Sequence, residues 1–370
     1  MNNPNLVYQI ALTLIKGIGC QTAKNLLAYV GDVEEIFKRN KQTFLKIPNI
    51  GNILSNNIIE QRHVALQRAE KEIAFIEKHK IIPLFFTDKN FPQRLKEYDD
   101  SPVLLYYKGN AELNQRRFLS IVGTRNATEY GKSLCSKIIE DLAINQPDLT
   151  IISGLAYGID VAAHKASLQY NVPNIGVLGH GLDKIYPAGH ASIAKKMIEN
   201  GGLLTEFISE TNPDRQNFVM RNRIIAGMAD AVLVVESASK GGALITAEIA
   251  NSYNKDVFAF PGRTNDEWSA GCNKLIKQHK AALIENANDL EYMMGWKQET
   301  KKISIQKELF IELTEEEQII YDILQKEKNI HIDLLAMKAN KNINKISPLL
   351  LSMEFKGIIK CIPGNIYGLL

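Results

Sequence analysis

Short apolar runs alternate with segments long enough to be helices from about residue 118 onward. The runs read FLSIVG, LTIIS, NIGVLG, GLLTEF, AVLVVE, DVFAFP and AALIE. Strands separated by helix-length segments predict an α/β fold with a parallel sheet covered by helices on both faces. Ligands of such folds bind at the carboxyl ends of the strands, so the residues that follow each run are the first candidates for a site.

The overall charge limits how the chain can bind a polyanion. Of 370 residues, 45% are hydrophobic and 23% charged, which is typical of a globular protein with two or three domains. Lys and Arg total 44 against 41 Asp and Glu, a net charge of only +3. Residues 81–296 carry 22 basic and 24 acidic side chains. Binding through bulk charge is therefore excluded, and any polyanion site must be local.

Cysteine usage and the N-terminus indicate the compartment. Cys20, Cys135, Cys272 and Cys361 lie far apart without a C-x-x-C pair, which argues against a zinc module or a disulfide framework. A reducing cytoplasm is expected, with no bound metal or cofactor. The first residues lack the features of a signal peptide, and no run of about 18 apolar residues occurs, so no membrane span is expected.

Residues 1–80 read as short helices separated by turns. Two similar pieces, LIKGIGCQTAKNLL and FLKIPNIGNILSNNII, each place an Ile-Gly turn before an apolar-periodic helix, with Gly19 and Gly51 at the turns. Helix-hairpin-helix (SAM-like) units have this pattern, and their glycine turns let backbone N–H groups approach a DNA phosphate. A helical bundle that simply uses glycine to turn fits the same residues.

The C-terminal part is predicted to be a separate small domain. Residues 297–312 are polar and weakly periodic and are interpreted as a linker, and residues 313–370 as a winged helix. A capping box over Thr314–Glu317 starts its first helix, HIDLLAMKAN forms the second, and Ser347-Pro348 is predicted to start the third. A hairpin turning at residues 363–365 would follow. The third helix is apolar, which favours a protein contact over reading a DNA groove.

The first strand-end loop contains Gly123, Thr124 and Arg125. Glycine permits a tight turn, threonine supplies a hydroxyl, and the N–H groups of the coming helix are predicted to form an anion seat that Arg125 could clamp. The nearby Gly-Lys-Ser triplet is no P-loop, because Asn126 stands where the first glycine of that motif must be. A dinucleotide-binding G-x-G-x-x-G is also absent from the sequence.

The second strand-end loop contains Ser153 and Gly154 and leads to Asp160 and His164, which are four residues apart on one helical face. They could form an acid/base or metal pair. We favour an aspartate near a helix N-terminus that pairs with the histidine one turn on, because no third ligand or nucleophile is in register.

The segment NFVMRNRII combines Phe218 with Arg221 and Arg223. Two arginines offer bidentate phosphate donors and the aromatic ring offers a stacking face, a combination that suits single-stranded nucleic acid. An arginine pair that ties the sheet to acidic neighbours such as Glu206 and Glu236 fits equally well.

A glycine loop follows the AVLVVE run and opens another helix, with Lys240 and Thr246 within reach of an anion; Arg263 follows the next run. Four strand-end loops thus share small residues, hydroxyls and isolated basic groups, and their repetition is more informative than any one loop.

Seven motifs in this order resemble the DNA-processing protein DprA (Smf) family over roughly residues 80–285. They are IVGTRNATEYG, SGLAYGIDVAAHKASL, GVLGHGLDKIYP, GGLLTEF, NFVMRNRIIAGMADAVLVVES, GGALITAEIA and VFAFPGR. The resemblance implies a non-enzymatic protein with an extended Rossmann-like domain that binds single-stranded DNA during natural transformation. It would protect incoming strands, load the recombinase RecA and act as a homodimer.

The family's DNA-binding positions carry over to thirteen residues of this sequence. They are Gly123, Thr124, Arg125, Ser153, Gly154, Phe218, Arg221, Asn222, Arg223, Lys240, Gly241, Gly242 and Thr246. Thr124 replaces a frequent serine and keeps the hydroxyl. Gly242 stands where many members have serine, which would remove one side-chain contact to phosphate. His180 is a further variation.

Two other functions are alternatives to this assignment. Nucleotide phosphoribohydrolases of related shape carry G-G-x-G-T-x-x-E, with which Glu248 is in register, but Leu244 and Ile245 occupy the Gly-Thr positions. This mismatch disfavours a hydrolase. A regulator that binds duplex DNA through the winged helix is the other alternative.

Overall fold

The computed structural model describes residues 3–296, 313–327, 329–362 and 364–369. It divides into two compact units, Met1–Lys297 and Gln298–Leu370. The predicted linker, residues 297–312, lies outside the described residues. The predicted boundary at residue 80 falls inside the first unit and stays a prediction.

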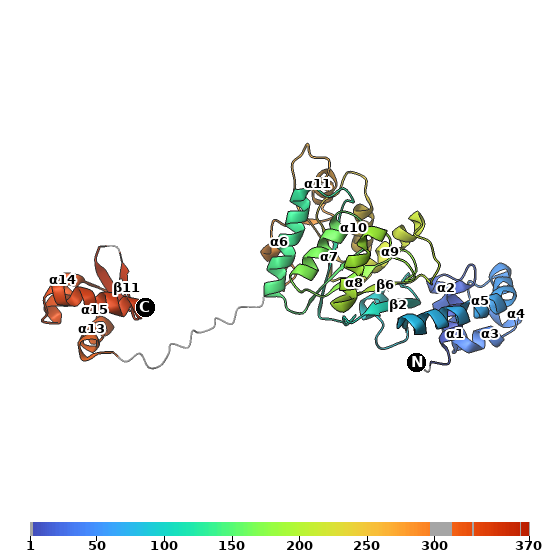
Figure 1. Ribbon diagram of the computed structural model, residues 1–370, viewed down its shortest axis with the longest axis horizontal. Coiled ribbons are helices and arrows are strands. Elements are labelled where there is room, and N and C mark those ends of the chain that lie inside the picture. The colour runs from blue at the N-terminus through green and yellow to red at the C-terminus, as the bar shows by residue number, and fades with distance from the viewer. Residues whose placement is uncertain (1–2, 297–312, 328, 363, 370) are drawn as a thin grey trace. The chain divides into compact units, whose positions relative to one another are not determined.

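A nine-stranded sheet forms the centre of the first unit (Figure 1). Its order is β1-β2-β6-β5-β4-β3-β7-β8-β9, and β3 to β9 run parallel, whereas β2 pairs antiparallel with both β1 and β6. The strands are β1 (Ile82–Phe85), β2 (Leu104–Gly109), β3 (Arg117–Val122), β4 (Leu149–Ser153), β5 (Asn174–Val177), β6 (Gly201–Thr205), β7 (Ala231–Val234), β8 (Asp256–Ala259) and β9 (Ala282–Leu283).

The predicted parallel α/β sheet is confirmed, and all seven apolar runs are strands. The pattern of apolar runs did not predict β1 and β2, which precede the first run. Both join the edge by antiparallel pairing without the alternating pattern of strand and helix, and β1 contains Pro83, a residue that argues against a central strand.

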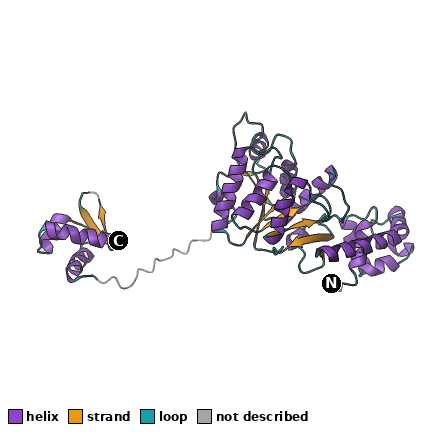
Figure 2. Cartoon of the chain, in the orientation of Figure 1, coloured by secondary structure: helices purple, strands orange, loops and turns teal. Residues whose placement is uncertain are grey.

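Helices cover both faces of the sheet, as the purple and orange elements of Figure 2 show. On one face lie α9 (Arg215–Met228), α10 (Gly242–Ser252) and α11 (Ala270–Lys277), and on the other α6 (Glu129–Asn145), α7 (Ile159–Gln169), α8 (Ala191–Glu199) and α12 (Ala287–Met293). Short 3-10 helices span Gln93–Glu97 and Ala188–His190.

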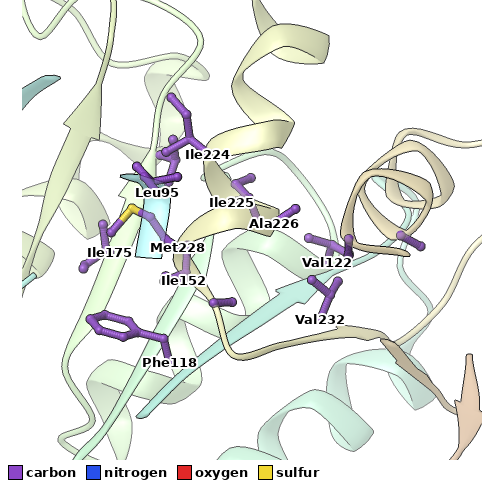
Figure 3. Packing of buried hydrophobic residues seen from close by; sticks show 14 of the residues in the cluster. Leu95, Phe118, Val122, Ile152, Ile175, Ile224, Ile225, Ala226, Met228 and Val232 are labelled. Atoms are coloured by element: carbon purple, nitrogen blue, oxygen red, sulfur yellow. The ribbon is translucent and has the colours of Figure 1, made fainter. Parts of the chain in front are cut away.

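Alternate residues of β3 point to opposite cores. Phe118 and Val122 pack with the α9 side, and Leu119 and Ile121 pack with the α6 side. Figure 3 shows Phe118 below the end of α9, near Ile152 and Met228. Burial on both faces explains why these strands read as continuous apolar runs.

Five helices precede the sheet: α1 (Leu6–Leu14), α2 (Cys20–Val30), α3 (Val33–Lys38), α4 (Lys41–Phe44) and α5 (Asn52–His79). Gly19 and Gly51 are the N-caps of α2 and α5, in extended conformation and with open space around them, as the two repeated pieces predict. The helices share one apolar core with β1 and β2.

A buried carboxylate connects α5 to the loop between β6 and α9. Glu72 is almost fully buried and accepts hydrogen bonds from the Ser209 backbone N–H at 2.9 Å and the Ser209 hydroxyl at 2.5 Å. Arg68 donates to Glu72 at 2.9 Å and to the Ser209 carbonyl at 2.7 Å. This loop leads directly into α9.

The second unit contains α13 (Glu315–Lys326), α14 (Ile332–Lys338) and α15 (Ile343–Phe355). Its three-stranded antiparallel sheet has the order β10 (Ile330–His331), β12 (Ile366–Leu369), β11 (Ile359–Ile362). The capping box over Thr314–Glu317 is confirmed. Part of the predicted hairpin turn, residue 363, lies outside the described residues.

The predicted start of the third helix was wrong. α15 begins at Ile343 after the N-cap Asn342, so Pro348 lies inside the helix. Proline removes the hydrogen bond to the carbonyl of Asn344 and crowds that carbonyl, but Asn344 is exposed, so water can replace the lost donor. Within the described ranges, no helix is long and apolar enough to cross a membrane.

Candidate nucleic-acid interface

A cleft of about 900 Å³ opens at the carboxyl ends of β3 and β7. The chain passes from β3 to β4 on one side, whereas β7 pairs with β3 on the other, so strand order reverses at this point. Open α/β sheets bind their ligands at such reversals. The cleft is lined by residues 122–125 at the end of β3, by one face of α9, and by residues 237–238 and 240–246 around the start of α10.

The cleft is strongly positive although its domain is not. Its lining contains the four cations Arg125, Arg215, Arg221 and Lys240. Among the described residues that line it, Asp160 is the one acidic side chain. Low-dielectric walls lined by one sign of charge concentrate the field and attract the opposite charge, here an anion.

One face of α9 supplies much of the lining. Arg215, Phe218, Arg221, Asn222 and Ile225 follow the i, i+3, i+4, i+7 spacing of a helical face, and all line the cleft. The basic and aromatic residues of the segment are therefore brought together by helix periodicity rather than by adjacency in sequence.

Arg221 forms the floor of the cleft. Its side chain is almost fully buried and donates from Nη1 to the Val177 carbonyl at 3.0 Å, while its Nε is buried without a partner. A Cβ on Gly154 would overlap both the Arg221 guanidinium and the Asp160 carboxylate, so only glycine fits there. Burial lowers the pKa of Arg221 and raises that of Asp160, and each charge partly offsets the effect on the other.

Two guanidinium groups lie within 6 Å of the centre of the Phe218 ring. Arg125 is 5.7 Å and Arg221 5.9 Å from the centre of its ring, and Tyr186 is 5.8 Å away, ring centre to ring centre. Cation–π contacts of this kind hold the aromatic ring beside the two positive charges. A nucleotide in the cleft would meet both chemistries at once.

The predicted anion seat at the start of α6 is already occupied. Thr128 caps this helix by accepting from Gly131 N–H at 3.0 Å, and the buried carboxylate of Glu236 accepts from the Thr128 N–H at 2.9 Å and its hydroxyl at 2.5 Å. Glu236 therefore takes the place predicted for a ligand anion, because β7 lies next to β3 in the sheet. Gly123, Thr124 and Arg125 still line the cleft.

The start of α10, by comparison, has no side-chain cap. Gly241 is its N-cap in extended conformation with no side-chain cap, and Gly242 has open space around it. Lys240 is exposed at the same end, whereas Thr246 turns its hydroxyl toward the Gly242 carbonyl at 3.4 Å. The first N–H groups of α10 thus face the cleft.

Four basic or polar side chains that the sequence analysis named do not line the cleft. Ser153 is buried and donates to the Ile121 carbonyl at 2.6 Å. Arg223 forms a bidentate ion pair with Glu206, at 2.5 and 2.7 Å, as the acidic-neighbour interpretation expected. Arg263 is exposed outside the lining, and His180 is buried outside it too.

Asp160 and His164 do not pair, contrary to the favoured interpretation. His164 Nδ1 lies 3.0 Å from the Asn174 side-chain oxygen, and Asp160 accepts a long hydrogen bond from Ala156 N–H at 3.4 Å. The hydrogen-bond partner of His164 comes from β5, and Asp160 lies at the cleft floor beside Arg221. Sequence spacing within one helix could not show either neighbour.

Burial lowers the pKa of His164 from 6.5 to about 4. Above pH 6.5 the histidine is neutral in the folded and unfolded chains, but below it only the unfolded chain takes up the proton readily. We expect this group alone to reduce the free energy of unfolding by about 3 kcal/mol as pH falls from about 6.5 to 4. Urea unfolding of the wild type and of His164→Gln, followed over this pH range, measures the difference; equal pH slopes would contradict it.

Glu248, the residue in register with the hydrolase motif, lies outside the cleft. Glu248 is exposed, pairs with Lys280 at 2.6 Å and does not line the cleft. The sequence reading did not single out Tyr186 or Trp268, both of which line the cleft. Tyr186 belongs to one of the seven motifs, whereas nothing in the local sequence distinguishes Trp268.

A family model of DNA recombination-mediator protein A matches residues 83–295, more than half of the chain. The chain belongs to the DNA recombination-mediator protein A (DprA) family. The predicted resemblance is therefore confirmed. A second model, the SAM-like helix-hairpin-helix tandem, matches residues 10–63 and covers both glycine turns, which supports helix-hairpin-helix units over a plain helical bundle.

Several DprA relatives align over most of the chain. Protein Smf of Synechocystis is 35% identical over 302 residues, which cover 80% of this chain and 74% of the relative. The X-ray structure of DprA from Streptococcus pneumoniae has a TM-score of 0.64 at 32% identity and covers 77% of this chain and 97% of that one. DprA from Helicobacter pylori, whose structure describes a single-stranded DNA binding mode, has a TM-score of 0.53 at 28% identity over 59% of this chain and 96% of that one.

Proposed function

We propose that this protein binds single-stranded DNA in the cleft, protects incoming strands and loads RecA onto them during natural transformation. It would act in the cytoplasm as a homodimer and not as an enzyme. The observation that carries the proposal is the charge of the cleft: four cations, one carboxylate and Phe218 line it in an otherwise slightly acidic domain.

Each part of the cleft suits one part of a nucleotide. Arg125 is exposed and can follow a phosphate, whereas Arg221 is fixed at the cleft floor by its hydrogen bond to the Val177 carbonyl and supplies positive charge there. The open start of α10 offers backbone N–H groups to a second phosphate. Phe218 offers a face on which any base can stack, which makes recognition tolerant of sequence.

Membership of the DprA family and the single-stranded DNA binding of the H. pylori protein support the DNA assignment. Family membership also motivates the roles of RecA and of a homodimer. The hydrolase alternative receives no support from the cleft, since Glu248 lies outside it.

A salt titration tests the proposed ligand. Labelled single-stranded and duplex oligonucleotides of equal length are compared by fluorescence anisotropy between about 50 and 200 mM salt. We expect preference for the single strand and a clear fall of affinity with salt. Arg125→Ala should weaken binding roughly 10-fold and reduce the salt slope by about 0.7, the value for one lost contact on a single strand.

Arg263→Ala is the matched control, because this exposed arginine lies outside the cleft. Equal binding of duplex and single strand, or an unchanged slope in Arg125→Ala, would contradict the proposal. RecA filament formation on strands coated with the protein tests the loading role, and incubation with nucleoside monophosphates tests for released base.

A further inference from the structure

Two exposed tyrosines stand at the rim of the cleft, on the loops that follow β4 and β5. Tyr157 is 54% exposed and Tyr186 is 47% exposed. Tyr186 also belongs to the cleft lining, and Ala156, next to Tyr157, does too. The rim therefore continues directly from the proposed DNA site.

The loop of Tyr157 is held firmly. Gly158 has φ +77°, and a Cβ there would overlap the Thr124 carbonyl, so this turn packs directly on the first strand-end loop. The Ile159 N–H donates to the same carbonyl at 3.1 Å. The Tyr157 ring contacts His190 at 4.9 Å between ring centres and at 71°, while more than half of the residue stays exposed.

One short segment, residues 186–190, contains Tyr186 and contacts Tyr157 through His190. His190 is buried and its Nδ1 lies 3.0 Å from the Leu155 carbonyl, which joins this segment to the Tyr157 loop. Tyr186 lies four residues before His190 and contacts Phe218 at 5.8 Å. Aromatic contacts thus link the cleft to Tyr186, and His190 links this segment to Tyr157.

This rim offers aromatic surface rather than positive charge. The four cations of the cleft lie after β3, on α9 and before α10, whereas Lys184, in the rim loop, is 3.6 Å from Asp183. Aromatic side chains bind single strands by stacking on bases, whereas basic side chains bind the phosphates. A protein partner would need a broader apolar area than two separate rings.

We infer that Tyr157 and Tyr186 form a stacking platform for bases of the single strand where it leaves the cleft. This inference rests on the proposed function, since it assigns a further subsite to the same ligand. The platform lengthens the binding site without adding phosphate contacts, so its contribution depends on strand length and little on salt.

The test compares oligothymidylates of roughly 4 and 16 nucleotides, the range of lengths that single-strand sites occupy. In the full chain, Tyr157→Ala combined with Tyr186→Ala should weaken binding of the long strand roughly 5- to 100-fold, with an unchanged salt slope. The short strand should lose much less. Phenylalanine at both positions should restore binding, and Tyr292→Ala, which removes a 74% exposed tyrosine of α12 outside the cleft, is the control.

Abasic sites in the long strand identify the contact. Where stacking is the cause, abasic substitution and tyrosine removal are not additive in a double-mutant cycle. Equal losses for both strand lengths, a reduced salt slope, or additive effects would overturn the inference. Failure of the wild type to bind either strand would instead refute the proposed function.

Discussion

Replacing Arg221 with alanine is expected to weaken binding of single-stranded DNA by roughly 10- to 100-fold, the largest effect of any one residue in the cleft. A hydrogen bond to a charged group is worth about 1.5–3 kcal/mol. Arg221 is buried at the cleft floor, where few waters can replace it, and its Nε has no protein partner. The salt slope should fall by about 0.7 for one lost phosphate contact.

Arg223→Ala is the matched control for Arg221→Ala, because both arginines belong to α9. The guanidinium of Arg223 donates hydrogen bonds to the Glu206 carboxylate and, at 2.9 Å, to the Asp100 carbonyl. Its removal should leave the salt slope unchanged. Circular dichroism of each variant checks that the fold is retained. A reduced slope in Arg223→Ala together with a normal one in Arg221→Ala would reverse the assignment.

Glu72→Ala is expected to lower the free energy of unfolding of the first unit by about 3 to 5 kcal/mol. Removing one partner of a buried charge network leaves the other groups unsatisfied. Here the Ser209 N–H and hydroxyl lose their acceptor, and Arg68 loses its carboxylate partner. Of the bonds between α5 and the loop that leads into α9, the Arg68 hydrogen bond to the Ser209 carbonyl would remain.

Tryptophan fluorescence during urea unfolding measures this effect on the first unit alone. The chain has two tryptophans, Trp268 and Trp296, and both belong to that unit. Glu70→Ala is the control, since Glu70 is exposed on the same helix and its removal should change stability by less than about 0.5 kcal/mol. Equal unfolding midpoints for the two variants would show that the Glu72 network contributes no stability.

Periodicity made the central fold predictable. Strands such as β3 and β7 are buried on both faces, so most of their residues are apolar, and the helix-length segments between them indicate parallel pairing. The sequence did not predict β1, at the edge of the sheet, or its neighbour β2, because antiparallel pairing needs no helical crossover.

Helix periodicity separates two arginines of α9, Arg221 and Arg223, that the sequence analysis grouped together. An α-helix turns 100° per residue, so residues two apart point about 200° apart. Arg221 and Arg223 therefore could not both face one ligand once the segment was helical. Applying that periodicity to the segment would have selected Arg215, Phe218, Arg221 and Asn222 as one face, which is the face that lines the cleft.

The sequence alone determined the parallel α/β sheet, the loops at its strand ends and the family, because these depend on short-range patterns of residue type. Tertiary structure decided which charges are available to a ligand. Glu236 fills the N-terminus of α6, Glu206 neutralises Arg223, and Arg221 stays at the cleft floor beside Asp160. The electrostatic field of a site depends on distances between charges from different elements, and only the folded chain sets those distances.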